Sequence, residues 1–176
     1  MNFVDIMQSY FRGEHIESLA FVLPVGAALV AMAVVAVRAE RGGFAWGMAI
    51  PLGLFGLLFI IASISIGMRT PNQVAQLERG YQADPAAMLA EELPRMQKVN
   101  ANWPIYITTW TVLVLLGVAT RFGVKADWGH GLGPALILIG AVGFVIDGFA
   151  ERRAIPYTAA LEDLAKEHGS APSTND

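Results

Sequence analysis

The chain contains no cysteine. This absence excludes disulfides, thiolate catalysis, thiolate zinc sites and iron–sulfur ligation. Charged residues are also scarce, at 15% of the chain against the usual share of about 25%, whereas 55% of the residues are hydrophobic. Such a chain has too few polar side chains to cover itself in water, so the composition predicts a membrane protein.

An excess of basic residues is missing as well. Twelve Lys and Arg stand against fifteen Asp and Glu, and a nucleic-acid partner would demand a basic surface to neutralise phosphates. We therefore expect no nucleic-acid partner. Residues 1–17 are net acidic and no small-residue cleavage signature follows the first apolar run, so we expect no cleaved signal peptide.

Four apolar runs are each long enough to cross about 30 Å of hydrocarbon as a helix rising about 1.5 Å per residue. They cover residues 18–37, 44–68, 103–120 and 129–150. Short polar turns join the first to the second and the third to the fourth. The sequence thus predicts an all-α membrane protein with four transmembrane helices arranged as two hairpins, over residues 15–69 and 103–153.

Two further helical segments are expected at the membrane surface. Apolar residues recur at helical spacing between Phe3 and Phe11, which predicts an amphipathic interfacial helix within residues 1–14. In the polar connector 70–102, the pairs Thr70-Pro71 and Asp84-Pro85 each resemble a helix cap followed by a first helical residue, so two short surface helices are expected.

Two more features bound the polar segments. Pro94 is expected to interrupt any helix through it. The tail, residues 154–176, is expected to hold a short helix around Leu161–Lys166 and to be disordered from Gly169 onward.

The two hairpins resemble copies of one unit. Arg38 lies eight residues before Trp46-Gly47, and Arg121 lies seven before Trp128-Gly129. Gly67, Pro71 and Leu77-Glu78 are similarly echoed by Gly148, Pro156 and Leu161-Glu162. Such a duplication would be a parallel repeat, which some transporters use, and it is also a simple way to build a four-helix bundle.

The orientation follows from counting Lys and Arg on each side of the membrane. Eight lie on the side of the termini and the connector, and four lie in the two short turns. This favours both termini in the cytoplasm of a bacterial cell, with the protein in the inner membrane. The acids follow the same distribution and the short turns are net basic, so the inverted orientation stays open.

A candidate polar cluster lies where the first, second and fourth spans reach the side of the termini. Asp147 is the one carboxylate inside an apolar run, and Glu151 follows it by one helical turn. Arg69 at the end of the second span is expected to form an ion pair there. The full cluster comprises Glu14, His15, Glu17, Arg69, Asp147, Glu151 and Arg152.

The histidines and carboxylates are the candidate ligands for a metal or a haem. Histidine and carboxylates could bind a divalent metal, but no recognisable ligand spacing such as His-Glu-x-x-His occurs. His15 and His130 are expected near opposite membrane faces, too far apart for one haem iron. Pairing His130 with Met48, or His15 with Met68, would match in depth, yet methionine at helical spacing is usually core. We therefore expect no metal or cofactor.

Small residues and tryptophans have structural interpretations. Gly43 with Gly47, and Gly129 with Gly133, have the small-x-x-x-small spacing that lets helices approach closely. The tryptophans are expected to anchor the spans at the two membrane interfaces. They are Trp46, Trp103, Trp110 and Trp128.

No reaction motif emerges, so function is predicted by class. The leading hypothesis is a non-catalytic accessory, assembly or scaffold subunit that contacts the lipid bilayer and other membrane proteins or further copies of itself. The alternative is a small transporter or channel that acts as a homo-oligomer of the repeated unit. A third hypothesis is a membrane-embedded lipid-modifying enzyme near Glu17, Asp147 and Arg152.

Overall fold

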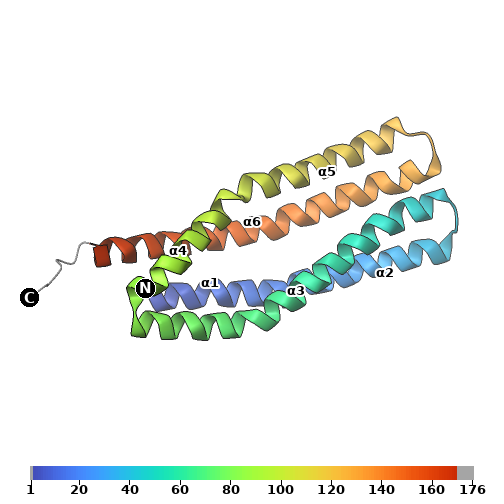
Figure 1. The fold of residues 1–176 in the computed structure, drawn as a ribbon. Coiled ribbons are helices and arrows are strands. Elements are labelled where there is room, and N and C mark those ends of the chain that lie inside the picture. The colour runs from blue at the N-terminus through green and yellow to red at the C-terminus, as the bar shows by residue number, and fades with distance from the viewer. Residues whose placement is uncertain (1, 170–176) are drawn as a thin grey trace, which may run out of the picture.

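The computed structural model describes residues 2–169, and this part of the chain is helical almost throughout (Figure 1). The elements are α1 Phe3–Glu17, the π-helical turn η1 Ser18–Val22, α2 Leu23–Ala39, α3 Gly43–Ala83, α4 Pro85–Ala101, α5 Trp103–Gly123 and α6 Asp127–Gly169. Because α1, η1 and α2 run on without a break and α4 meets α5 at Asn102, the chain forms four long helical rods.

Each rod is long and apolar enough to cross a membrane over part of its length. The apolar halves of α2, α3, α5 and α6 lie toward the two short turns. Large apolar side chains on them are exposed, including Val35 at 64%, Ile61 at 61% and Leu115 at 61%. A soluble protein rarely exposes so wide an apolar surface, whereas lipid tails solvate it without cost.

Close backbone approaches hold the apolar halves together. The helix α2 packs on α3, α5 packs on α6, and α3 and α6 join the two pairs. A Cβ built at Gly26 would lie 2.8 Å from the Gly56 carbonyl oxygen, and one built at Gly117 would lie 2.7 Å from that of Gly133. Such contacts favour helix association in lipid, where packing replaces the hydrophobic effect.

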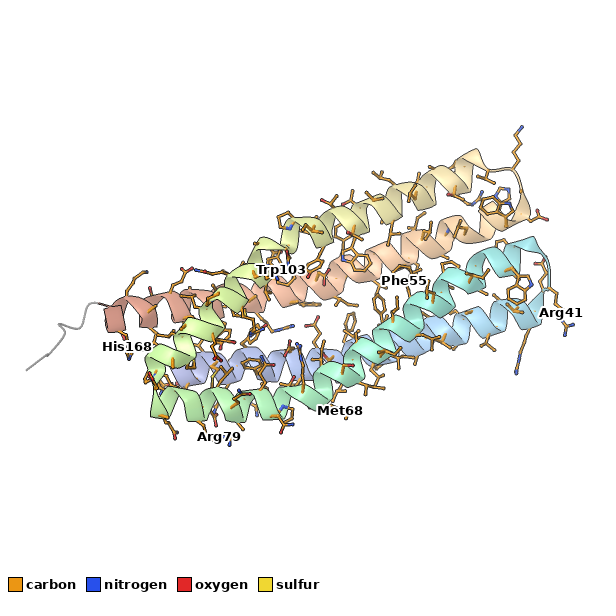
Figure 2. The ribbon with its side chains drawn as sticks, in the orientation of Figure 1. Arg41, Phe55, Met68, Arg79, Trp103 and His168 are labelled. Carbon is orange, nitrogen blue, oxygen red and sulfur yellow. The ribbon has the colours of Figure 1, made fainter. Side chains whose placement is uncertain are left out.

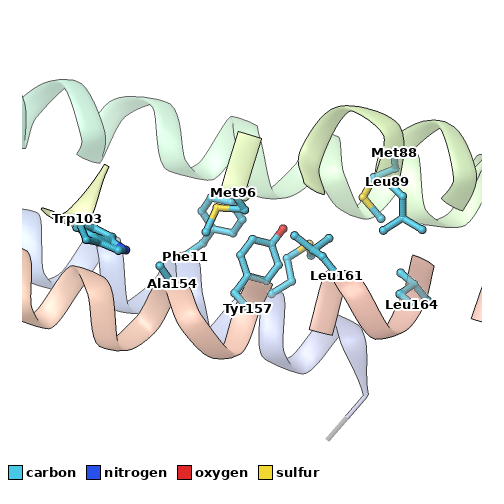
Figure 3. Packing of buried hydrophobic residues seen from close by; sticks show 10 residues of the cluster. Phe11, Met88, Leu89, Met96, Trp103, Ala154, Tyr157, Leu161 and Leu164 are labelled. Atoms are coloured by element: carbon cyan, nitrogen blue, oxygen red, sulfur yellow. The ribbon is translucent and has the colours of Figure 1, made fainter. Parts of the chain in front are cut away.

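The polar halves form a second bundle with its own core. Residues from α1, α4 and α6 surround Tyr157, which is 0% exposed (Figure 3). Aromatic rings of α1 pack on it, with the Tyr10 ring stacked at a centroid distance of 4.7 Å and the Phe11 ring edge-on at 5.8 Å. Figure 2 shows Arg79 and His168 on this half and Arg41 at the opposite end of the molecule.

The structure does not place an amphipathic helix in the membrane interface, nor a surface connector. Residues 3–17 continue in line with α2, and their apolar side is buried against the protein, with Met7 and Phe11 at 0% and 1% exposure. The end of α3 and α4 likewise extend along the molecule. The apolar stripes were identified correctly, but they pack on one another.

Two proline assignments were wrong and one was right. The α3 helix runs through Thr70-Pro71, and α4 runs through Pro94. The Thr70 hydroxyl donates to the Ile66 carbonyl at 2.7 Å instead of capping a helix start. Asp84 is the cap expected, since its side chain accepts from the Ala87 N–H. Neighbouring packing stabilises helices that proline weakens.

The segment from Ala154 to Gly169 is also longer in helix than expected. It continues α6 through Pro156, and Leu161 and Leu164 join the polar-half core. The disorder expected from Gly169 onward falls, for residues 170–176, outside the described residues.

The buried core of the polar halves predicts the effect of a truncation. Leu161→Ala removes a side chain that is 0% exposed, and we expect it to lower the free energy of unfolding by about 2–5 kcal/mol. Ile155→Ala, at a position 55% exposed on the same helix, is the matched control and should change little. Denaturant unfolding in one detergent, followed by circular dichroism, measures both, and equal losses would contradict the buried core.

Candidate functional site

The boundary between the apolar and polar halves carries the first group of charged side chains. Glu14 on α1 accepts from the Arg69 guanidinium at 3.2 Å, and its other carboxylate oxygen lies 3.3 Å from the Thr70 hydroxyl oxygen. Thr70 is 3% exposed, whereas the Arg69 side chain is 57% exposed. The contact ties α1 to α3 where α3 leaves the apolar half.

A second ion pair lies beside the π-helical turn. Glu17 pairs with Arg153 of α6, and the Glu17 side chain is only 11% exposed. The His15 Nδ1 and the Arg153 Nε are buried without a hydrogen-bond partner among the described residues. Because η1 begins at Ser18, directly after this pair, the chain widens from α-helical to π-helical winding at the point where it accommodates these polar groups.

Asp147 has a different partner from the one expected. The Trp110 Nε1–H of α5 donates to its carboxylate at 2.5 Å. Gly143 makes room for this contact, since a Cβ there would overlap the indole ring. The expected ion pair between Asp147 and Arg69 was therefore wrong, because Arg69 pairs with Glu14 of α1.

The structure thus brings together only part of the expected cluster. Glu14 with Arg69, and Glu17 with Arg153, form two separate pairs on α1, and Asp147 forms a third contact with α5. Glu151 and Arg152 form no salt bridge within residues 2–169. Arg153, one residue beyond the expected set, is the arginine that enters the site.

The glycines and tryptophans lie in contacts of two kinds. Gly43 and Gly47 face Trp128 on α6, while Gly133 faces α5 and Gly129 faces Val124 of its own turn. Trp46 and Trp128 are 51% and 48% exposed near the turns, where an interfacial anchor is expected. Trp103 was assigned wrongly, because it is 8% exposed in the polar-half core and donates to Asn100 Oδ1 at 3.1 Å. Trp110 is partly buried against α6.

Sequence reasoning missed a buried network in the polar halves. Glu92 of α4, only 4% exposed, accepts two hydrogen bonds from Arg95 at 2.7 and 2.6 Å and one from the Tyr157 hydroxyl at 2.9 Å. The spacing of Glu92 and Arg95 on one helix face could have suggested their pairing. Tyr157 lies 65 residues away, and no local signal points to it.

The same network perturbs the ionisation of its members. Burial, and then the charge of Glu92 and the hydrogen bond to it, raise the pKa of Tyr157 well above its ordinary value of 10.0. Burial also raises the pKa of Tyr10, which stacks on it. The hydrogen bonds to Glu92 raise the pKa of Arg95. The hydrogen bonds of Glu92 join α4 to α6, which is a structural role.

Within the described residues, no three His, Asp or Glu side chains are gathered closely enough to hold a metal ion. His130 instead faces Arg121, with 2.9 Å between its Nδ1 and the guanidinium. Comparison with protein-family models, curated protein sequences and solved structures finds no match to this chain. Function must therefore be inferred from the arrangement of the side chains.

The raised pKa of Tyr157 predicts how the protein responds to alkali. A folded-state pKa above the unfolded value of about 10 means that the contribution of Tyr157 to stability is complete below pH 10. That contribution is lost as the pH rises through the folded-state pKa. We expect the tyrosinate absorbance assigned to Tyr157, as wild type minus Tyr157→Phe, to appear well above pH 10. A difference that develops at pH 10 in the folded protein would contradict the buried hydrogen bond to Glu92.

Proposed function

We propose that this protein is a non-catalytic subunit of a membrane complex, with an accessory, assembly or scaffold role. The observation that carries the proposal is the continuity of its helices. Each rod passes from an apolar half into a polar half, and the polar halves share a core around Tyr157. A bundle built on uninterrupted membrane helices presents its surface to partners at a fixed height and angle, as a scaffold requires.

The charged side chains support this role, because they are used in contacts within the protein. Glu14, Glu17 and Asp147 each have a partner on another helix. Glu92 has one partner on α6, Tyr157, and one on its own helix, Arg95. A catalytic carboxylate must be within reach of a reacting atom. A lipid-modifying enzyme predicts an open cleft near Glu17, Asp147 and Arg152. Instead Glu17 is paired and nearly buried, which counts against that alternative.

The scaffold is further proposed to be a tandem duplication. In support, equivalent helix boundaries recur 84 residues apart (127 − 43): α2 and α5 end at Ala39 and Gly123, and α3 and α6 begin at Gly43 and Asp127. The ends of α1 and α4, Glu17 and Ala101, keep the same separation. In this register Leu77-Glu78 matches Leu161-Glu162, whereas Trp46 and Trp128 do not correspond.

Reciprocal contacts across α3 and α6 support the same proposal. A Cβ at Gly47 would overlap the Trp128 carbonyl oxygen, and one at Gly131 would overlap the Phe44 carbonyl oxygen. Gly131 and Trp128 are the counterparts of Gly47 and Phe44 in the 84-residue register. Contacts that exchange in this way are those of a two-fold symmetric pair.

The duplication also keeps a transporter or channel as the second candidate, because parallel repeats occur in transporters. In a single chain, however, the reciprocal contacts bring the backbones of α3 and α6 together on the pseudo-axis near the short turns. A solute path would therefore have to run between copies of the protein. Placement in a bacterial inner membrane with cytoplasmic termini remains part of the proposal and rests on the count of basic residues.

The decisive experiment is native mass spectrometry of the tagged full-length protein, extracted gently from its own host membrane. We expect the protein together with other membrane subunits in fixed stoichiometry. Liposomes that hold the purified protein alone should show the same solute flux as empty vesicles. A symmetric homo-oligomer with flux above that baseline would replace the scaffold proposal by the transporter.

The duplication has a separate test in matched glycine variants. Gly47→Leu and Gly131→Leu should each lower the free energy of unfolding by a similar amount, about 1–3 kcal/mol, because each forces a side chain into the facing backbone. Gly148→Leu is the control, since a Cβ there meets nothing within 4 Å. Denaturation in one detergent compares the three. A loss confined to one of the two glycines would argue against the symmetric relation.

A further inference from the structure

An open groove between α1 and α3 lies just beyond the apolar halves. Its volume is about 560 Å³, and its lining includes Gln8, Arg12 and His15 from α1 and Thr70 from α3. Gln8, Arg12 and His15 share one face of α1, because they are spaced four and three residues apart. The groove therefore offers the Arg12 cation beside the His15 ring.

Depth places His15 at the level of the lipid headgroups and Arg12 just outside it. The apolar run of the first rod begins at Ser18, so His15 and Arg12 lie about 4.5 and 9 Å beyond it at about 1.5 Å per residue. The headgroup layer occupies roughly the 5–7 Å outside each edge of the hydrocarbon core. On the membrane side of the same face of α1, Ile16 is apolar and exposed at 56%, as a contact to an acyl chain requires.

The groove also contains a cation without an ion-pair partner. Arg12 forms no salt bridge with any residue from 2 to 169. Its side chain is exposed, so the guanidinium is free to donate to a phosphate oxygen in the groove. Asp5 lines the outer end, where it already accepts from the Asn2 N–H.

We propose that the groove between α1 and α3 binds the phosphate of an anionic phospholipid, with Arg12 and His15 on the headgroup and Ile16 along an acyl chain. Arginine is suited to this task because its planar fork can donate two hydrogen bonds to one phosphate. The inference requires the membrane location but does not depend on the scaffold role. A bound lipid would cover the join between α1 and α3.

The counterpart of this face in the second hairpin provides an internal comparison. In the 84-residue register, Arg12 and His15 correspond to Met96 and Val99 of α4. Met96 is 0% exposed in the polar-half core. The donors therefore occur on one copy only, and a single lipid per chain is expected.

The test measures lipid retention by native mass spectrometry on the full-length protein in detergent. Phosphatidylglycerol and phosphatidylcholine are titrated in parallel. We expect one phosphatidylglycerol to bind with at least about tenfold preference, and Arg12→Gln to weaken it by about tenfold. Arg12→Lys keeps the charge and should retain most of the binding. Arg41→Gln, at the opposite end of the molecule (Figure 2), is the matched control and should bind as wild type does.

Three results would overturn the proposal. Equal retention of the two lipids would show that no phosphate-specific site exists. Equal losses in Arg12→Gln and Arg41→Gln would indicate general charge attraction. Inorganic phosphate that displaces the lipid at millimolar concentration would assign the groove to a free anion. Unchanged circular dichroism spectra of the variants make sure that a loss of lipid is not a loss of fold.

Discussion

The continuity of each helix across the edge of the hydrocarbon is the constraint on which the rest of this structure depends. Inside lipid every backbone N–H and C=O must be paired within the chain, so the apolar runs have to be helical. Where α3 and α6 reach water, no turn residue ends the helices. They continue through Pro71 and Pro156. The distance and the tilt between the helices in the polar halves are therefore set by the membrane bundle. The polar halves must pack at that distance.

The helix spacing set by the membrane bundle explains which side chains fill the polar-half core. Helices that diverge from a glycine contact leave wide gaps, and large side chains are needed to close them. The α3 and α6 backbones touch at Gly47 and Gly131 near the turns, while Tyr157, Phe11 and Met96 occupy the centre at the other end. Glu92, itself paired with Arg95, then accepts from the Tyr157 hydroxyl, which could not otherwise be buried without cost.

The sequence was sufficient to predict the four apolar spans. It was insufficient to predict which side chains contact one another. Apolar runs fix membrane helices because desolvation is a local property of each residue, and the Asp84 cap is equally local. The partner of Asp147 depends on how far α5 is shifted along α6, and the close contacts at Gly117, Gly133, Gly140 and Gly143 fix that shift. Trp103 was misplaced for the same reason: its indole could face lipid or core, and the rotation of α5 decides between them.

The proposed duplication sharpens the question of where function resides. Arg69 and Arg153 are counterparts in the 84-residue register, yet both pair with α1, through Glu14 and Glu17. The equivalent α4 positions hold Lys98 and Ala101, which cannot accept from an arginine. In terms of the proposed duplication the pairing is one-sided, because both accepting carboxylates lie on α1. Packing alone would allow these carboxylates on either hairpin. Their placement on α1 therefore directs the search for partners and ligands to that helix.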